Sequence, residues 1–423
     1  MKNMKYHFII ITLFLAISNC FGQYEGPVPA ITSGYGSFGT NGISVSYITN
    51  DNFLARDISV FYPKGITTAV PTIFFLHGWG GIYPSFSQET INNLVSNGYA
   101  VVHVPYKSFG VTNAERYTTL FDGFVKAAQN LPNIIDTSRV GFYGHSLGGG
   151  AVPRISYRLF TENNWGANGK FIYCDAPYYS FELGTSSLAN FPTDCKMLTV
   201  LYDKDDINDL RMGMDVFNNI SIDSNNKDCI IVYPDSVSGY VYEANHSEAA
   251  QYTTNSVYNA YDYYITFRLL NALADYTFTG NLTAKDIALG NGSAAQVSMG
   301  SQLNPLTVTD NPSPIYPESI YTNPCSDPIN ERTAFCSAIL SLNEIDSQSE
   351  NISIYPNPTE NQLTIDIDEI QSEFTVSIFD MNGKLILESS NQKILDLNVI
   401  ETGVYFIHVN INSNLSSYKL IKK

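Results

Sequence analysis

Positive charge is scarce in this sequence. Its 423 residues include 23 Lys and Arg against 40 Asp and Glu, which gives a formal net charge of −17, and only 15% of the residues are charged. Nucleic-acid binding requires clusters of Lys and Arg that meet phosphates, so this composition argues against nucleic acid as a partner. The same excess of acid argues against adsorption to anionic membranes and favours a soluble surface.

Hydrophobic runs long enough to cross a membrane are also lacking. The apolar run at residues 8–17 follows a positively charged start but is too short to span a bilayer comfortably. Small residues at Cys20 and Gly22 then suit signal-peptide cleavage. We therefore expect a signal peptide over residues 1–22 and a protein that leaves the cytoplasm and is not integral to the membrane. A lipoprotein anchored at Cys20 is a less favoured alternative, because Asn19 precedes that cysteine.

Cysteine is the third residue type in short supply. Six are present, and five of them follow the expected signal peptide. An oxidising compartment permits disulfides between them. Cys325 and Cys336 bracket a short polar loop and are the preferred pair, with Cys174 and Cys195 as a second, weaker pairing. One thiol would remain free.

The middle of the chain, from about residue 43 to 278, alternates short apolar runs with amphipathic segments. Several runs place β-branched or aromatic residues at consecutive positions, which is typical of strands buried on both faces. Strands that alternate with helices predict crossover units and a mostly parallel sheet, and therefore an α/β fold. The expected strands are Val45–Ile48, Asp57–Tyr62, Thr72–Leu76, Ala100–Val104, Val140–Tyr143, Phe171–Cys174, Leu198–Tyr202 and Ile230–Tyr233, and the expected helices are Phe86–Ser96, Arg116–Gln129, Gly149–Phe160 and Asn255–Leu273.

The rest of the chain divides into three parts. Residues 279–336 are rich in proline and are expected to form a loop-rich extension that closes a first domain spanning residues 23–336. The polar and acidic residues 337–351 are typical of a linker. Residues 352–423 alternate in a way that predicts a small antiparallel sandwich, with a hairpin turn at Asp380–Gly383. Its expected strands are Leu363–Ile367, Phe374–Phe379, Leu385–Glu388, Ile394–Leu397 and Val404–Asn410.

Four motifs of this last part carry a resemblance to a known family. ISIYPNPTENQL, VSIFDMNGKLI, ETGVYFIHV and the terminal YKLIKK follow one another over residues 352–423. Together they are similar to the C-terminal sorting domain of type IX secretion substrates in Bacteroidetes. The resemblance implies export across the outer membrane by the type IX secretion machinery, often followed by removal of the domain. An unrelated carbohydrate-binding sandwich is the alternative, disfavoured because the segment has no Trp to stack on sugars.

The stretch VGFYGHSLGGG, residues 140–150, places five glycines around one serine where a strand is expected to end. Gly144, Ser146 and Gly148 fit the pattern G-x-S-x-G between a strand and a helix, which is the arrangement of a nucleophile elbow. A serine on such a sharp turn stands clear of the sheet, and side chains two positions away would clash. The pattern therefore predicts Ser146 as a nucleophile, and a plain glycine-rich turn is the alternative.

A serine hydroxyl needs a base near neutral pH, and histidine suits that role. The sequence has six histidines. Only His246, in a polar loop beyond the last strand of the first domain, fits the chain order Ser…acid…His of an elbow enzyme, so it is expected to be the general base. The other five have different explanations: His7 lies in the signal peptide, His77 in a glycine-rich loop, His103 inside an apolar strand, His145 in the elbow with its side chain pointing away from the nucleophile, and His408 in the C-terminal segment.

The acid that orients the imidazole is expected just after the strand Leu198–Tyr202. The sequence there begins with Asp203 and continues Lys-Asp-Asp, so three carboxylates compete. Asp203 is nearest the strand end, and spacing barely separates Asp205 from Asp206 in the turn beyond it. The same carboxylates, together with Asp209, could instead bind calcium. Their spacing lacks the glycine and the distal Glu of an EF-hand loop, which disfavours the metal.

Negative charge that develops on a substrate oxygen needs fixed N–H donors. One donor is expected from Leu147, the residue after the nucleophile. The other is expected from the loop LHGWGG, residues 76–81, where glycines permit a tight turn and the Trp79 amide is the candidate. A simple glycine turn is the alternative.

These pieces together resemble the α/β-hydrolase superfamily, and within it the branch of dienelactone hydrolases and bacterial cutinases, which includes poly(ethylene terephthalate) hydrolases. The resemblance spans roughly residues 26–336 and is carried by HGWGG, by DTSRV before GHSLGGG, and by DAPY, LYDKDDI and NHSE. It implies an α/β-hydrolase fold, and it favours Asp205 as the acid because an aliphatic residue, here Ile207, tends to follow two positions later. It also implies that Trp79 and Tyr178 bind substrate.

The resulting expectation is a secreted serine hydrolase of carboxylic esters that works through an acyl-enzyme and requires no cofactor. Its substrate would be a small-molecule or polymeric ester. His77 stands where the polyester hydrolases tend to have proline, and the extension at residues 279–336 is unusually long, so polyester specificity does not follow from the resemblance. A serine peptidase on the same fold and a non-catalytic surface binding protein are the alternatives.

Overall fold

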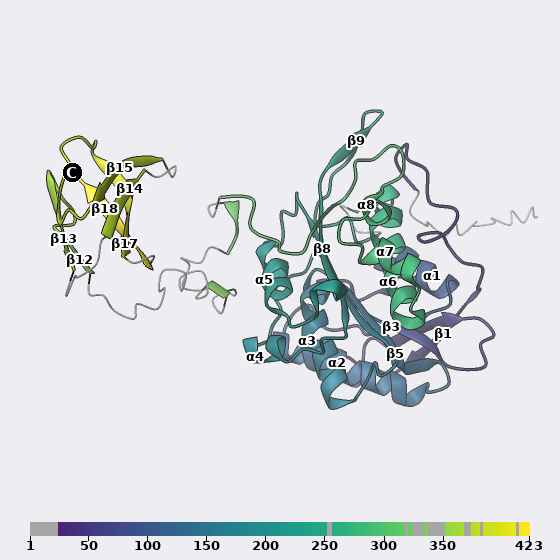
Figure 1. Cartoon of the computed structure of the whole chain (residues 1–423). Helices are drawn as coiled ribbons and strands as arrows, with labels where there is room; N and C mark the ends of the chain where they lie inside the picture. The colour runs from purple at the N-terminus through teal and green to yellow at the C-terminus, as the bar shows by residue number, and fades with distance from the viewer. Residues whose placement is uncertain are drawn as a thin grey trace, which may run out of the picture. The chain divides into compact units, whose positions relative to one another are not determined.

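The computed structural model describes residues 24–251, 256–317, 320–323, 332, 335–336, 352–367, 374–380, 384–411 and 414–423. The chain divides into two compact units, Met1–Arg332 and Thr333–Lys423 (Figure 1). Each unit has its own sheets and its own apolar core.

Within the described residues, a nine-stranded sheet forms the centre of the first unit, in the order β1-β2-β4-β3-β5-β6-β7-β8-β11 (Figure 1). Strands β3 to β8 pair in parallel, whereas β1, β2 and β11 run antiparallel to their neighbours. The expected α/β class with a mostly parallel sheet is therefore confirmed, and every strand predicted for this unit is present. The strands are β1 (Ile43–Ile48), β2 (Ile58–Pro63), β3 (Val70–Leu76), β4 (Ala100–His103), β5 (Ile135–His145), β6 (Lys170–Asp175), β7 (Lys196–Tyr202), β8 (Lys227–Val232) and β11 (Thr307–Thr309), and β9 (Asp235–Val237) pairs with β10 (Tyr240–Tyr242) as a separate hairpin.

Helices cover both faces of this sheet, because successive side chains of a strand point to opposite faces. Phe74 of β3 packs on one face against Phe124 of α2. Its neighbour Phe75 belongs to the cluster on the other face, with Leu94 of α1 and Leu269 of α6. Burial on both faces explains the consecutive apolar residues of the central strands. The helical elements are η1 (Pro84–Ser87), α1 (Gln88–Ser96), α2 (Asn113–Asn130), α3 (Leu147–Glu162), α4 (Thr185–Ala189), α5 (Arg211–Asn219), η2 (Ser224–Asn226), the π-helical η3 (Asp262–Phe267), α6 (Arg268–Thr279), α7 (Leu282–Ala288) and α8 (Ala294–Val297).

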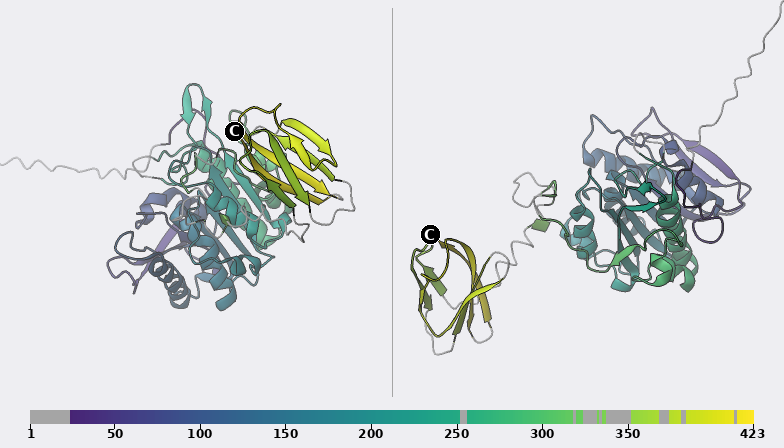
Figure 2. Two further views of the ribbon diagram at one scale, coloured as in Figure 1. Left: turned by 90° about the vertical axis from the view of Figure 1, so that its left-hand side faces the viewer. Right: turned by 90° about the horizontal axis from the view of Figure 1, so that it is seen from above.

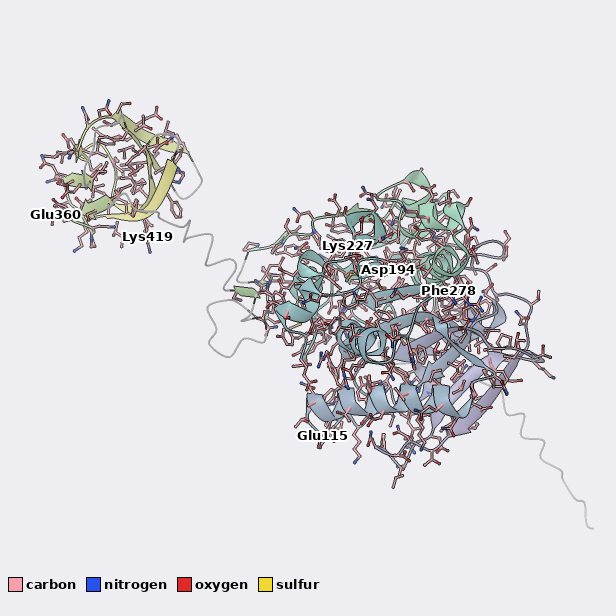
Figure 3. All side chains as sticks on the ribbon, turned by 60° about the horizontal axis from the view of Figure 1, so that its bottom comes forward. Glu115, Asp194, Lys227, Phe278, Glu360 and Lys419 are labelled. Carbon is pink, nitrogen blue, oxygen red and sulfur yellow. The ribbon has the colours of Figure 1, made fainter. Side chains whose placement is uncertain are left out.

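Local sequence signals explain where the long helices begin and end. Helix α2 starts with a capping box, in which Thr112 Oγ1 accepts from Glu115 N at 3.2 Å and the Glu115 carboxylate accepts from Thr112 N at 2.7 Å. Glu115 is labelled in Figure 3. Helix α6 ends at Thr279 because Gly280 adopts a left-handed φ of 77°. The helix predicted at 255–273 therefore ends later than expected, and its first predicted residue lies outside the described residues.

The proline-rich stretch after α6 is more ordered than the sequence predicts. Residues 282–288 and 294–297 form α7 and α8, and β11 adds a strand to the sheet edge, antiparallel to β8. The sequence predicts a loop-rich extension, and these three short elements were not foreseen. A strand of three residues is too short for its alternation to be recognised in the sequence.

The C-terminal unit contains two antiparallel sheets, β12-β13-β16 and β15-β14-β17-β18 (Figure 2). Both sheets contribute to one apolar core, in which Leu363 and Ile365 of β13 meet Val376 of β14 and Ile407 of β17. All five predicted strands are present, two further strands were not predicted, and the centre of the predicted hairpin turn, residues 381–383, lies outside the described residues. The strands are β12 (Ile352–Tyr355), β13 (Gln362–Ile367), β14 (Phe374–Phe379), β15 (Leu385–Ser390), β16 (Ile394–Asp396), β17 (Gly403–Ile411) and β18 (Asn414–Lys422).

The cysteines resolve one of the two pairing hypotheses. Cys174, Cys195 and Cys229 are buried and free, so the weaker prediction of a bridge between the first two is wrong. Cys336 is disulfide-bonded, but Cys325 lies outside the described residues, so that pair stays a prediction.

Candidate active site

The sharp turn between β5 and α3 carries Ser146. Its φ of 58° and ψ of −124° lie in a region that residues with a side chain rarely adopt. A Cβ added to Gly144 would come within 2.5 Å of the Gly148 carbonyl oxygen, and one added to Gly148 would come within 2.0 Å of the Leu76 carbonyl oxygen. The glycines of the motif are therefore required by close backbone approach, as the sequence predicts for a nucleophile elbow.

Backbone hydrogen bonds to the end of the neighbouring strand β6 and to the loop after it hold Ser146 in its strained conformation. Ser146 N donates to the Asp175 carbonyl at 2.9 Å, and Tyr178 N donates to the Ser146 carbonyl at 2.9 Å. The loop after β6 thus fixes the elbow. It also brings Tyr178, which is half-buried, beside the serine.

Three side chains that lie far apart in the sequence meet at the carboxyl ends of the parallel strands. His246 Nε2 lies 2.9 Å from Ser146 Oγ, and His246 Nδ1 lies 2.8 Å from Asp205 Oδ2. An ionised carboxylate only accepts hydrogen bonds, so Nδ1 carries the proton and the neutral Nε2 accepts from the serine hydroxyl. This is the geometry in which a histidine can remove a proton from a serine.

The acid loop separates the two carboxylates that the sequence could not distinguish. The Asp205 side chain is fully buried, and its Oδ1 accepts from Ile207 N at 3.0 Å and Asn208 N at 2.8 Å. Asp206 is exposed and lines a groove beside the loop. Asp205 is therefore the carboxylate that the structure brings to His246.

The other carboxylates near Asp205 have separate partners. Asp203 pairs with Lys204 at 2.7 Å, and Asp209 pairs with Arg211 at 2.8 Å. Within the part of the chain that the structure describes, no group of three or more His, Cys, Asp or Glu is arranged to hold a metal ion.

His145, which the sequence analysis set aside, belongs to the site. Its Nε2 donates to the His246 carbonyl oxygen at 2.8 Å, and the centres of the two rings lie 4.9 Å apart. Burial, followed by the proximity of His246, lowers the pKa of His145 to about 3, so it is neutral at ordinary pH. This side chain was expected to point away from the nucleophile, and its contact with the His246 loop was not foreseen. The contact joins the elbow to the His246 loop, and no sequence pattern signals a bond to a backbone carbonyl 101 residues away.

The glycine-rich loop after β3 lies against Ser146, since a Cβ added to Gly78 would approach the serine Cβ to 3.2 Å. The buried His77 orients this loop, because its Nδ1 donates to the Gly78 carbonyl at 2.7 Å while its Nε2 accepts from Tyr106 N at 3.2 Å. The carbonyl and the N–H of one trans peptide point in opposite directions, so this bond also fixes the Trp79 amide. Leu147, the other predicted donor, is the first residue of α3, where an amide has no intrahelical partner.

Aromatic groups line the approach beside this loop. The Trp79 side chain is 51% exposed, the Arg116 guanidinium lies 4.7 Å from its ring centre, and Phe109 meets it edge-on at 5.2 Å. Ser108 Oγ accepts from Gly80 N at 3.0 Å and ties the two loops together. Phe109 and Arg116 were not predicted, because only the fold brings them to Trp79.

Buried carboxyl groups lie behind the histidine loop. Burial raises the pKa of Asp175 to about 7, of Asp262 to about 7 and of Glu248 to about 8. Tyr143 donates to Asp175 at 3.0 Å, and Gln251 donates to Asp262 at 2.8 Å. One oxygen of Asp175 and one of Glu248 have no hydrogen-bond partner among the described residues, which favours their neutral forms.

Comparison with known families identifies the C-terminal unit. Residues 353–423 match the secretion system C-terminal sorting domain, as the four sequence motifs predict. The protein is therefore secreted by the type IX route. No helix among the described residues is long and apolar enough to span a membrane.

The chain also has a distant relative among characterised proteins. Kynurenine formamidase of Drosophila melanogaster is 28% identical over 103 residues, which cover 24% of this chain and 34% of that protein. The chain thus spans about a third of the length of this curated relative. The similarity is to a hydrolase, and nothing in it distinguishes the cutinase branch.

Proposed function

We propose that this protein is a secreted serine hydrolase of the α/β-hydrolase fold that cleaves carboxylic esters. The observation that carries the proposal is the continuous chain of hydrogen bonds from Ser146 Oγ through His246 to Asp205. The serine on a sharp turn between β5 and α3, within a mostly parallel sheet, also supports the proposal.

In the first half of the reaction, Ser146 Oγ attacks the ester carbonyl while its proton passes to His246 Nε2. Asp205 holds the imidazole in the reactive tautomer and stabilises the imidazolium that forms. The carbonyl oxygen gains negative charge, and the amides of Leu147 and Trp79 are the donors proposed to receive it. His246 then gives the proton to the departing alcohol.

In the second half, water replaces the alcohol. His246 takes a proton from the water, which attacks the acyl-enzyme carbonyl, and the proton passes back to Ser146 Oγ as the acid leaves. Tyr178 N donates to the Ser146 carbonyl, and Trp79 follows Gly78, which lies against Ser146. Both side chains are proposed to contact the acyl group.

The test compares the full-length chain with Ser146→Ala on p-nitrophenyl butyrate. Loss of the nucleophile should lower kcat by several orders of magnitude and leave only the residual catalysis of the oxyanion donors. An alanine variant that retains most of the activity would show that another group performs the chemistry.

A second candidate is hydrolysis of an amide, favoured by the similarity to a formamidase. The same His246 could protonate the amine that leaves an N-formyl arylamine. Kinetics on matched formyl esters and N-formyl anilines would separate the two, since the ester proposal predicts the higher kcat/KM on the ester. Two further alternatives remain. A peptidase predicts turnover of peptide substrates, and a non-catalytic binding protein predicts no turnover of any substrate.

A further inference from the structure

A groove of about 670 Å³ lies beside the triad and has no part in the chemistry described above. One wall is the acid loop with Ile207, and the other is the hairpin of β9 and β10 with Val241. This hairpin extends from the body of the first unit (Figure 1). This volume is within the range of pockets that bind small-molecule ligands.

Residues next to triad members in the sequence line the groove. Its floor includes Asn245 and Ser247, the two residues that flank His246, and its wall includes Asp206, which follows Asp205. The backbones of these two loops are joined, since Lys204 N donates to the Ala244 carbonyl at 3.0 Å. The groove therefore lies beside the loops that carry His246 and Asp205, although the three triad side chains are not part of its lining.

Proton transfer determines which half of an ester extends to that side. His246 must reach the oxygen of the departing alcohol to protonate it, so that oxygen lies at His246 Nε2 when the bond breaks. We propose, given the ester hydrolysis proposed above, that this groove binds the alcohol portion of the substrate and that this alcohol is uncharged and rich in hydroxyl groups, as in a sugar ester.

The groove's polar groups point to hydroxyls as the groups recognised. Asp206 and Glu243 can accept hydrogen bonds from hydroxyls, and an anionic alcohol would be repelled by them. Asn245 is already oriented, because its Nδ2 donates to Glu243 Oε2 at 2.8 Å and its Oδ1 accepts from Ser247 N at 2.8 Å. A hydrocarbon alcohol would remove these groups from water and would offer no hydrogen bonds in place of those that they make with water.

Two exposed aliphatic side chains complete the match. Ile207 is 61% exposed and Val241 is 56% exposed, and both line the groove. The C–H faces of a sugar ring can pack against such residues while its hydroxyls reach the polar floor. The charge of Lys204, also in the groove, is paired with Asp203 at 2.7 Å.

The experiment uses three acetyl esters that differ only in the alcohol: ethyl acetate, an O-acetylated methyl glucoside and acetylcholine. The secreted full-length chain should have a kcat/KM about tenfold or more higher on the sugar ester than on ethyl acetate, which is the worth of one or two gained hydrogen bonds. A preference for ethyl acetate or for acetylcholine would overturn the proposal.

Variants test the groove itself. Val241→Trp should lower the ratio of kcat/KM between sugar ester and ethyl acetate about tenfold by filling the groove, and Asp206→Ala should lower it several-fold. Leu282→Trp places the same side chain at a distant site that is 73% exposed and should leave the ratio unchanged. Unchanged ratios in both groove variants would contradict the proposal. Failure of all three esters to be cleaved would instead count against the ester hydrolase, which keeps the two failures distinguishable.

Discussion

The C-terminal unit and the first unit bury different kinds of side chain. In the described part of the C-terminal unit the core consists of aliphatic and aromatic residues, and Thr359 and Lys422 are its buried polar residues. The first unit buries a set of ionisable groups, including Asp175, Asp262 and Glu248. Burying an ionisable group costs stability unless it is paired or neutral, so a fold retains many of them where they have a further use.

Backbone strain is distributed in the same unequal way. In the described residues of the C-terminal unit the one non-glycine residue with positive φ is Asn391, a residue type that tolerates the left-handed region. In the first unit such residues include Ser146 and two alanines, Ala176 and Ala244, which stand next to Asp175 and two residues before His246. Three of the seven such residues described in the first unit therefore lie in the elbow, in the loop that holds it or in the His246 loop, where strain is expected of a functional site.

The largest expected effect comes from the acid. Asp205→Asn should lower kcat by about 10⁴, because an amide can donate to Nδ1 and so favours the wrong imidazole tautomer. Asp206→Asn should lower kcat at most about tenfold, because Asp206 lines the groove. Steady-state kinetics on p-nitrophenyl butyrate measures both, with Asp366→Asn on β13 as the control in the other unit. A larger loss at Asp206 than at Asp205 would reverse the assignment.

Close backbone approach gives the next effect. Gly148→Ala should destabilise the first unit by about 3 kcal/mol or more, since its Cβ would lie 2.0 Å from a backbone oxygen. Gly403→Ala in the C-terminal unit should cost less than about 1 kcal/mol, because the nearest atom to its Cβ is a Tyr405 ring carbon at 3.3 Å. Differential scanning calorimetry measures the unfolding of both units. Equal losses of stability in the two variants would contradict the expected difference between the units.

A smaller effect is expected where His145 supports the base. His145→Ala should lower kcat by about 10-fold to 100-fold with little change in KM, because the His246 loop loses the bond that positions it. His145→Gln can donate to the same carbonyl and should restore part of the rate. A purely structural role predicts instead that both variants lose thermal stability and that kcat per folded molecule is unchanged.

The smallest effect concerns the pH dependence of stability. Burial raises the pKa of Glu248 from 4.5 to about 8, so the folded state binds its proton more tightly than the unfolded state. The stabilisation of the folded state that comes from this tighter proton binding is fully present below about pH 4.5 and is lost as the pH rises towards 8. Glu248→Gln should remove roughly 1 kcal/mol per pH unit of that loss across this window. Thermal unfolding of both proteins from pH 5 to 8 measures the two slopes, and parallel curves would contradict the buried neutral carboxyl.

The two units also differ in how far their sequences predict their structures. The alternation of the C-terminal strands and the apolar runs of the parallel strands predict nearly every strand, because burial on one face or on both leaves a readable pattern. The strands β9, β10 and β11, of three residues each, are too short to show such a pattern and were missed, as were the four-residue β12 and the polar β18.

The candidate site divides along similar lines. Ser146 and Trp79 follow from local motifs, and His246 follows from chain order. The distinction between Asp205 and Asp206 depends on a loop conformation that one residue of spacing does not determine. The contacts of His145, and of Arg116 with Trp79, join segments that only the fold brings together.

The most direct measurement of the central claim is labelling of the folded, full-length protein with a fluorophosphonate, followed by peptide mass spectrometry. A serine activated by His246 and Asp205 should react once, on the peptide that contains Ser146, and His246→Ala should strongly slow the reaction. The absence of an adduct, or an adduct on any other residue, would contradict the account.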